Sequence, residues 1–332
     1  MTDASPTAEG TVYPGLWQAR VGLLFKGLRQ NWVLFTANKI GLVGLAIIIF
    51  FGLMVIAYPF LEQTVWDERG FHPGYGAAFE VYDPVTGYDI PPEGKAHPLG
   101  PSWRHPLGTD ERGRDILSQL MFSAKNEFLL GLTAAVITAA VATLAGAIAA
   151  YYGGVVDTLL MRLADLIVLF PLISFLILMS ALFPLGLLEL ALFVGLFVGF
   201  GATAIILKSQ ALAVKVKPYI EAARVAGGGH LHIILSHFVP NLLPLAFLYM
   251  MFTVTTAIFS EAVLSYFGLL PDVTMSWGVM INTTKQTGYT LQFIEKWWLI
   301  FPASVSITLL CSAFYLVGRG LDEVVNPRLR RR

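Results

Sequence analysis

Apolar residues are concentrated in six long runs separated by polar segments. The runs cover residues 40–60, 128–150, 163–183, 190–207, 242–260 and 298–317. Each has about 18 to 23 residues, the length that a helix rising 1.5 Å per residue needs to cross a hydrocarbon core of about 30 Å. The runs lack the polar and apolar alternation of barrel strands, and a helix satisfies its own backbone hydrogen bonds in lipid. The pattern therefore predicts an all-α integral membrane protein with six transmembrane helices.

Composition supports a membrane protein. Hydrophobic residues make up 56% of the chain and charged residues 13%, and the mean hydropathy is +0.67, which excludes an ordinary soluble domain. The single Cys311 rules out an intramolecular disulfide and a cysteine-built metal site. The first 37 residues lack the short apolar core and cleavage site of a signal peptide, so we expect the first apolar run to remain as an anchor.

Charge is unevenly distributed between the two faces that six crossings define. About 14 of the 22 Lys and Arg fall on the face that carries both termini, which the positive-inside rule assigns to the cytoplasm. We therefore predict a cytoplasmic N-terminal segment (1–37), a first span with a long outer loop (38–125), a core of five further helices (126–320) containing a cytoplasmic loop (209–241), and a basic cytoplasmic tail (321–332). The outer loop is rich in Pro and Gly, so we expect an ordered loop over the outer mouth of the bundle rather than a separate domain.

The cytoplasmic loop between the fourth and fifth runs has the pattern of a helix, a turn and a second helix. Residues 215–241 read KVKPYIEAARVAGGGHLHIILSHFVPN. Pro218 is preorganised for a first helical turn, and the glycines at 227–229 stop a helix. We expect the second helical stretch to end before Pro240. Small side chains at Ala222 and Ala223 allow close approach to a partner's groove, so the loop is predicted to dock a soluble protein.

This loop resembles the ATPase-coupling loop of ATP-binding-cassette (ABC) importer permeases. The residues that carry the resemblance are Glu221, Ala222, Ala223, Arg224, Gly227, His237, Pro240 and Asn241. Four other stretches resemble the second permease subunit of the dipeptide and oligopeptide importer family: HPLGTDERGRD (105–115), YYGGVVDTLLMRLADLIVLFP (151–171), EAVLSYFGLL (261–270) with SWG (276–278), and NPRLRRR (326–332). The resemblance extends from about residue 20 to the end, but the segment 71–99 is longer than the family pattern.

The resemblance implies the type I ABC importer permease fold in the inner (plasma) membrane of a prokaryote. It implies a heterodimer with a second homologous permease, two cytoplasmic ATPases and an extracytoplasmic substrate-binding protein, which Ser276 would face. ATP and Mg would be bound by the ATPases, and no cofactor, metal or catalytic residue is expected in this chain, which has no GxxxxGK[ST] phosphate loop. Short peptides are the cargo that the resemblance favours, and oligosaccharides, which relatives also carry, are the alternative.

Two further groups of residues are candidate sites. The outer-face motif Gly108, Thr109, Asp110, Gly113, Arg114 and Asp115 could bind a cation, but capping of a short helix by Thr109 or Asp110 is simpler. The apolar stripe that follows, starting at Ile116, predicts that this helix lies flat at the membrane surface. In the fifth run, the residues Tyr249, Met250, Met251 and Thr253 could line a transport pathway, and ordinary helix packing is an equally favoured alternative.

Other functions have weaker support. The spacing of His230, His232 and His237 does not place them on one helical face, so we expect them to be structural rather than metal ligands. Asp165 is costly in lipid and has Arg162 as its nearest candidate partner. A secondary transporter would need paired intramembrane charges, and an intramembrane enzyme a nucleophile with a base, an HExxH motif or two facing acids. We identify none of these in the sequence.

Overall fold

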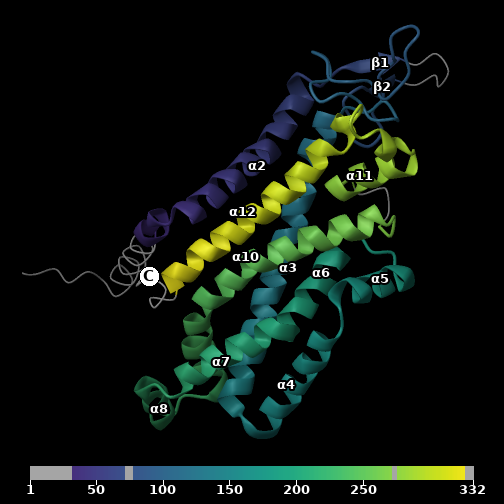
Figure 1. Cartoon of the computed structure of the whole chain (residues 1–332). Coiled ribbons are helices and arrows are strands. Elements are labelled where there is room, and N and C mark those ends of the chain that lie inside the picture. Colours follow the sequence, from purple (N-terminus) through teal and green to yellow (C-terminus); the bar gives the residue numbers. More distant parts are fainter. Residues whose placement is uncertain (1–31, 72–77, 271–274, 326–332) are drawn as a thin grey trace, which may run out of the picture.

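The computed structural model describes residues 32–71, 78–270 and 275–325. Within these ranges, five continuous helical segments are long and apolar enough to cross a membrane: α2 (Lys39–Thr64), α3 (Ile116–Tyr152), α6 with α7 (Leu187–Lys215), α9 with α10 (His230–Tyr266) and α12 (Phe301–Val325). A sixth consists of α4 (Gly154–Leu169) and α5 (Leu172–Leu182). Figure 1 shows these helices side by side in one elongated bundle. The prediction of a six-helix membrane protein is confirmed.

The third predicted span is not a straight helix. The chain bends by 87° between α4 and α5, at Phe170 and Pro171, which both have extended backbone angles. Proline has no backbone N–H and disfavours helical geometry in the residue before it. The apolar run predicted over 163–183 is therefore not one straight helix, because Pro171 divides it into two segments.

Two π-helical turns interrupt other spans. η1 (Gly199–Thr203) joins α6 (Leu187–Val198) to α7 (Ala204–Lys215). η2 (Ile234–Phe238) joins α9 (His230–Ile233) to α10 (Val239–Tyr266). The sequence predicted that the second helical stretch of the loop ends before Pro240. This prediction is wrong, because the helix continues through Pro240 into α10. The wider turn lets the helix continue through a residue that cannot donate a backbone hydrogen bond.

The longest helix, α3, lies at the centre of the bundle and packs closely against α7. A side chain added at Gly146 would lie 2.7 Å from the backbone nitrogen of Lys208. Ala142 and Ala150, four residues away on either side, are fully buried. Small residues four apart let helix backbones approach, which accounts for the close packing of α3 on α7.

The segment between α2 and α3 is more structured than a loop. It contains a short antiparallel pair, β1 (Arg69–Phe71) and β2 (Ala78–Glu80). The chain then enters α3 at Ile116, so the helix expected to lie flat at the surface is instead the start of the second span. A domain boundary at residue 125 would divide α3. Figure 1 shows the strands at one end of the molecule and α8 (Pro218–Val225) at the other.

The remaining elements, α11 (Trp277–Gln286), η3 (Tyr289–Gln292) and η4 (Trp297–Leu299), lie between α10 and α12. Trp298 packs on Gly108 and donates its indole N–H to the Thr109 carbonyl over 3.3 Å. This contact joins the segment before α12 to the end of the molecule that carries the strands. Most of the predicted N-terminal segment and the end of the basic tail lie outside the described residues.

Candidate functional site

The helix α8 ends in a turn that its glycines make possible. It begins at Pro218 as predicted, and Gly227 has a φ of +83°, a backbone conformation that side chains other than glycine rarely adopt. The N–H of Gly228 donates to the Ala223 carbonyl over 2.9 Å and that of Gly227 to the Arg224 carbonyl over 3.0 Å. These two bonds form a Schellman motif, which fixes the direction of the chain leaving the helix.

One apolar side chain anchors α8 to the spanning helices. Ile220 is fully buried in a cluster formed by α3, α7 and the start of the fifth span, with Tyr151, Val214, Ile233 and Phe238 among its members. Burying such a side chain contributes about 1.5 to 3 kcal/mol. The short helix is therefore packed directly against the transmembrane bundle.

Tyr151, at the end of α3, contacts both sides of the glycine turn. The Arg224 guanidinium lies 5.0 Å from the centre of its ring, and its hydroxyl is 2.7 Å from Nδ1 of His230. The ring also packs edge-on against Phe238. Tyr151 therefore joins α8 to α3 and to the fifth span.

The opposite face of this region is exposed, and its Tyr219 ring contacts the ring of His237. Val225 is 85% exposed and Leu231 69% exposed, and Tyr219 is also exposed. Glu221 and Ala222 lie on the surface beside them. Exposed apolar side chains rimmed by polar ones are typical of surfaces that bind another protein or a membrane.

The other predicted loop residues have structural contacts. His237 is partly buried, and its carbonyl accepts a hydrogen bond from the exposed Asn241 over 2.6 Å. Pro240 lies in the first turn of α10. His232 contacts Ser236. No group of three or more His, Cys, Asp or Glu that could hold a metal ion occurs in the described ranges.

The outer-face motif forms a buried polar cluster. Arg114 pairs with Asp110 over 2.7 Å, and Gln119 donates to the same carboxylate over 3.2 Å. Gly108 and Gly113 have φ values of +80° and +82°. The sequence predicted that Thr109 or Asp110 caps a helix, and this prediction is wrong. The side-chain oxygens of both residues accept other hydrogen bonds in this region instead.

The residue that caps α3 is Asp115. Its carboxylate accepts from the Ser118 N–H over 2.6 Å and lies 2.8 Å from Nδ1 of His105, whose Nε2 is 3.1 Å from Asp89. Burial lowers the pKa of His105, but hydrogen bonds and charges from the two carboxylates outweigh it and raise the pKa above its usual value. Burial raises the pKa of Glu111, which accepts a hydrogen bond from Thr287.

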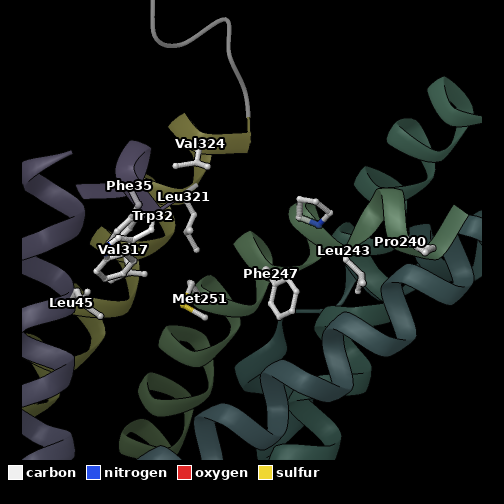
Figure 2. Close-up of a pocket in the computed structure, with 11 residues that line it drawn as sticks. Trp32, Phe35, Leu45, Pro240, Leu243, Phe247, Met251, Val317, Leu321 and Val324 are labelled. Atoms are coloured by element: carbon white, nitrogen blue, oxygen red, sulfur yellow. The ribbon is translucent and has the colours of Figure 1, made fainter. Parts of the chain in front are cut away.

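The four candidate pathway residues do not share one environment. Thr253 is buried and donates to the Tyr249 carbonyl over 3.0 Å, and Met250 packs against the core. Met251 lines a cavity of about 590 Å³ between α2, α10 and α12. Figure 2 shows Met251 and Phe247 projecting from α10 into this space. Among the described residues that line the cavity, the Trp32 indole is the only polar side-chain group.

Three expectations about charged and polar residues can be compared with the structure. Asp165 pairs with Arg162 over 3.6 Å, as expected. Ser276 is buried and caps α11, so it cannot face a delivery protein as the resemblance suggested. The expectation that no two acids face each other is wrong, because Glu127 and Glu261 lie together in the interior.

These features define a class: a multi-pass helical membrane protein with a bent third span and a short exposed helix packed against one end of the bundle. Comparison with known proteins gives the family. Residues 142–331 match the family model described as "Binding-protein-dependent transport system inner membrane component". The match covers more than half of the chain, and the chain belongs to this family.

Individual relatives extend the similarity beyond the matched domain. The chain is 30% identical to the dipeptide transport system permease protein DppC of Bacillus subtilis over 91% of its own length and 86% of that protein. It is 31% identical to the oligopeptide transport system permease protein OppC of B. subtilis, over 90% and 88% of the two chains. The OppC of Haemophilus influenzae is 34% identical over 68% of this chain and 71% of that protein. The relatives are permease subunits of transport systems, and this chain is a multi-pass inner-membrane transport protein.

Proposed function

We propose that this chain is a permease subunit of an ATP-driven importer and forms half of a transmembrane pathway together with a second homologous permease. The helix α8 and the glycine turn dock a cytoplasmic ATPase, and a second ATPase docks on the other permease. An extracytoplasmic binding protein delivers the cargo. This chain contributes no catalytic residue, and ATP and Mg are bound by the ATPases.

The observation that carries the proposal is the position of α8. Its inner side is fixed to α3 and the fifth span through Ile220 and Tyr151, whereas its outer side presents Val225 and Glu221 to the surroundings. A rigid helix with one packed and one unpartnered face can carry a rigid-body motion from a soluble partner to the spans. The predicted coupling residues Ala222, Ala223 and Arg224 belong to this helix.

The orientation follows from the same arrangement. If α8 meets a cytoplasmic ATPase, the strands and the outer-face motif lie on the opposite side of the membrane, because Figure 1 shows them at the other end of the bundle. Both termini are then cytoplasmic, in agreement with the distribution of Lys and Arg.

Short peptides are the proposed cargo. The relatives named above are dipeptide and oligopeptide permeases, which favours peptides over oligosaccharides. We do not assign the peptide to the apolar cavity beside Met251, because the peptide backbone has donors and acceptors that the cavity lining would leave unsatisfied. We infer that cargo passes along a surface completed by the second permease.

The test is to co-purify the tagged chain with its partners from membranes in mild detergent and to compare the native protein with Gly227→Asp. The φ of +83° at Gly227 strains any substituted residue, so the variant should distort the turn and lose the ATPases while it stays in the membrane. ATP-driven uptake of radiolabelled peptides should fall in parallel.

Gly94→Asp is the matched control. Gly94 has a φ of +77°, and, as at Gly227, an added Cβ would meet no atom within 4 Å, but it lies between α2 and α3 at the opposite end of the molecule. We expect this variant to retain the ATPases. Retention of the ATPases and of uptake in Gly227→Asp would refute the coupling assignment, and uptake that follows an ion gradient without ATP would indicate a secondary carrier.

A further inference from the structure

Two acidic side chains that the coupling site does not use face each other inside the protein. Glu127 belongs to α3 and Glu261 to α10. Each is only 1% exposed, and their carboxyl groups lie within hydrogen-bonding reach of each other. Since 134 residues separate them in the chain, helix packing alone brings them together.

The hydrogen bonds around the pair are incomplete. Oε1 of Glu261 accepts from the hydroxyl of Ser265 over 2.6 Å and from that of Ser276 over 2.5 Å. Oε2 of Glu261 and both carboxyl oxygens of Glu127 make no well-formed hydrogen bond in the described part of the chain, although the backbone N–H of Trp277 lies close to the Glu127 carboxyl group. An ionised carboxylate only accepts hydrogen bonds, so two ionised groups would leave three buried oxygens unsatisfied.

Among the described residues, the surroundings of the pair supply no compensating charge. Neither carboxyl group has an ion pair with Lys or Arg within residues 32–71, 78–270 and 275–325. Trp277 of α11 packs nearby in the apolar core, and the Cys311 thiol of α12 lies within electrostatic reach of Glu127. Two like charges held together in such an interior are strongly unfavourable.

We propose that Glu127 and Glu261 bind one proton between them. The carboxyl group that carries the proton donates a hydrogen bond to the other, which remains a carboxylate. A single proton removes one of the two charges and supplies the missing donor. The remaining negative charge is shared by the pair and is stabilised by the hydroxyls of Ser265 and Ser276, so the proton belongs to the pair rather than to either residue.

This proton-binding site lies where three helices meet. A side chain at Gly278 of α11 would lie 3.2 Å from Oε2 of Glu261 and 2.7 Å from Cβ of Ser265, so α11 approaches α10 very closely. The Asn126 amide donates to the Met275 carbonyl over 2.7 Å, and the Trp277 indole to the Leu120 carbonyl over 3.0 Å. The bound proton therefore holds α3 and α10 together beside the start of α11, and both acids are positioning residues.

The test is infrared spectroscopy of the purified full-length protein. The native chain should show the C=O stretch of a buried protonated carboxyl group at neutral pH, and Glu127→Gln should abolish it, because the glutamine amide supplies the donor and leaves Glu261 ionised. Thermal unfolding should change little in this variant. Glu189→Gln, at an exposed acid in the first turn of α6, is the control and should keep the band.

Two outcomes would overturn the proposal. One is the absence of such a band from the native spectrum, with a Na⁺-dependent rise in unfolding temperature instead, which would show that a cation neutralises the pair. The other is a band of undiminished intensity in Glu127→Gln. If Glu127→Gln does not fold, Glu261→Gln makes the same test from the other side, because its amide can donate to Glu127.

Discussion

The two ends of the helical bundle differ in whether their characteristic side chains find partners within the chain. At the end that carries the strands, Arg114, Asp110 and His105 have buried partners within the same chain. At the other end, α8 is held by Ile220 and Tyr151 but leaves Val225 and Leu231 exposed. The polar cluster at the first end is satisfied within the chain, whereas α8 at the second end presents a surface that a partner can cover.

Arg114→Ala is expected to have the largest effect on stability and to act at the self-contained end. Removing one member of a buried ion pair leaves an unpaired charge and costs about 3 to 5 kcal/mol. The unfolding temperature should fall and amide exchange in residues 80–115 should accelerate. The exposed Arg112 provides the control, and equal effects of Arg112→Ala and Arg114→Ala would contradict the contrast between the ends.

Ile220→Ala should loosen α8 from the bundle. Truncating a buried isoleucine costs about 2 to 5 kcal/mol, and here the loss should appear as faster amide exchange in residues 218–230 with little change in residues 80–115. Val225→Ala, at an exposed position of the same helix, should leave exchange unchanged in the isolated chain. Uniform acceleration over the whole protein in Ile220→Ala would show that α8 is not a locally anchored element.

Tyr151→Phe separates the hydrogen bond to His230 from the ring contacts with Arg224 and Phe238. Losing the hydroxyl should cost about 1 kcal/mol, while the ring keeps its packing. ATP-driven uptake should weaken more than ATPase retention does, because the partner surface of α8 is intact. Tyr152→Phe is the control, since that neighbouring side chain is half exposed; the same defect in both variants would argue against a specific role for Tyr151.

The smallest expected effect is a pH dependence of the end that carries the strands. The pKa of His105 is raised in the folded protein, so its contribution to stability is complete below the unfolded value of about 6.5 and is lost as the pH rises through the folded value. Amide exchange in residues 80–115, corrected for the intrinsic rate, should therefore accelerate above neutral pH.

His105→Gln should abolish this pH dependence, and exchange that slows with rising pH in the native protein would contradict the sign. No corresponding change is expected around α8. The comparison of the two ends would thereby be made within a single experiment.

Much of the fold could be predicted because spanning helices must be long and apolar. The break at Pro171 was signalled by the residue, but its 87° bend depends on packing that local sequence does not specify. The strands and the polar cluster before α3 were missed because short segments held by side-chain hydrogen bonds have no periodic pattern. The helix cap was assigned to Thr109 or Asp110 instead of Asp115 for the same reason.

The candidate site shows the same division. Pro218 and Gly227 mark the start of α8 and its turn through backbone preferences that a sequence reveals directly. The contacts of Tyr151 with Arg224 and His230 join residues that are far apart in the chain. Glu127 and Glu261 each fell one residue outside a predicted span, because a charged residue ends an apolar run even when helix packing later buries it.

The central claim, that α8 meets an ATPase, is tested most directly by site-specific crosslinking in a Cys311→Ala background. Val225→Cys should crosslink to the co-expressed ATPase, whereas Trp103→Cys, at a fully exposed position near the opposite end, should not. A crosslink at Val225 alone would establish the docking surface. Absence of a crosslink at Val225, in a complex that still contains the ATPase, would contradict it.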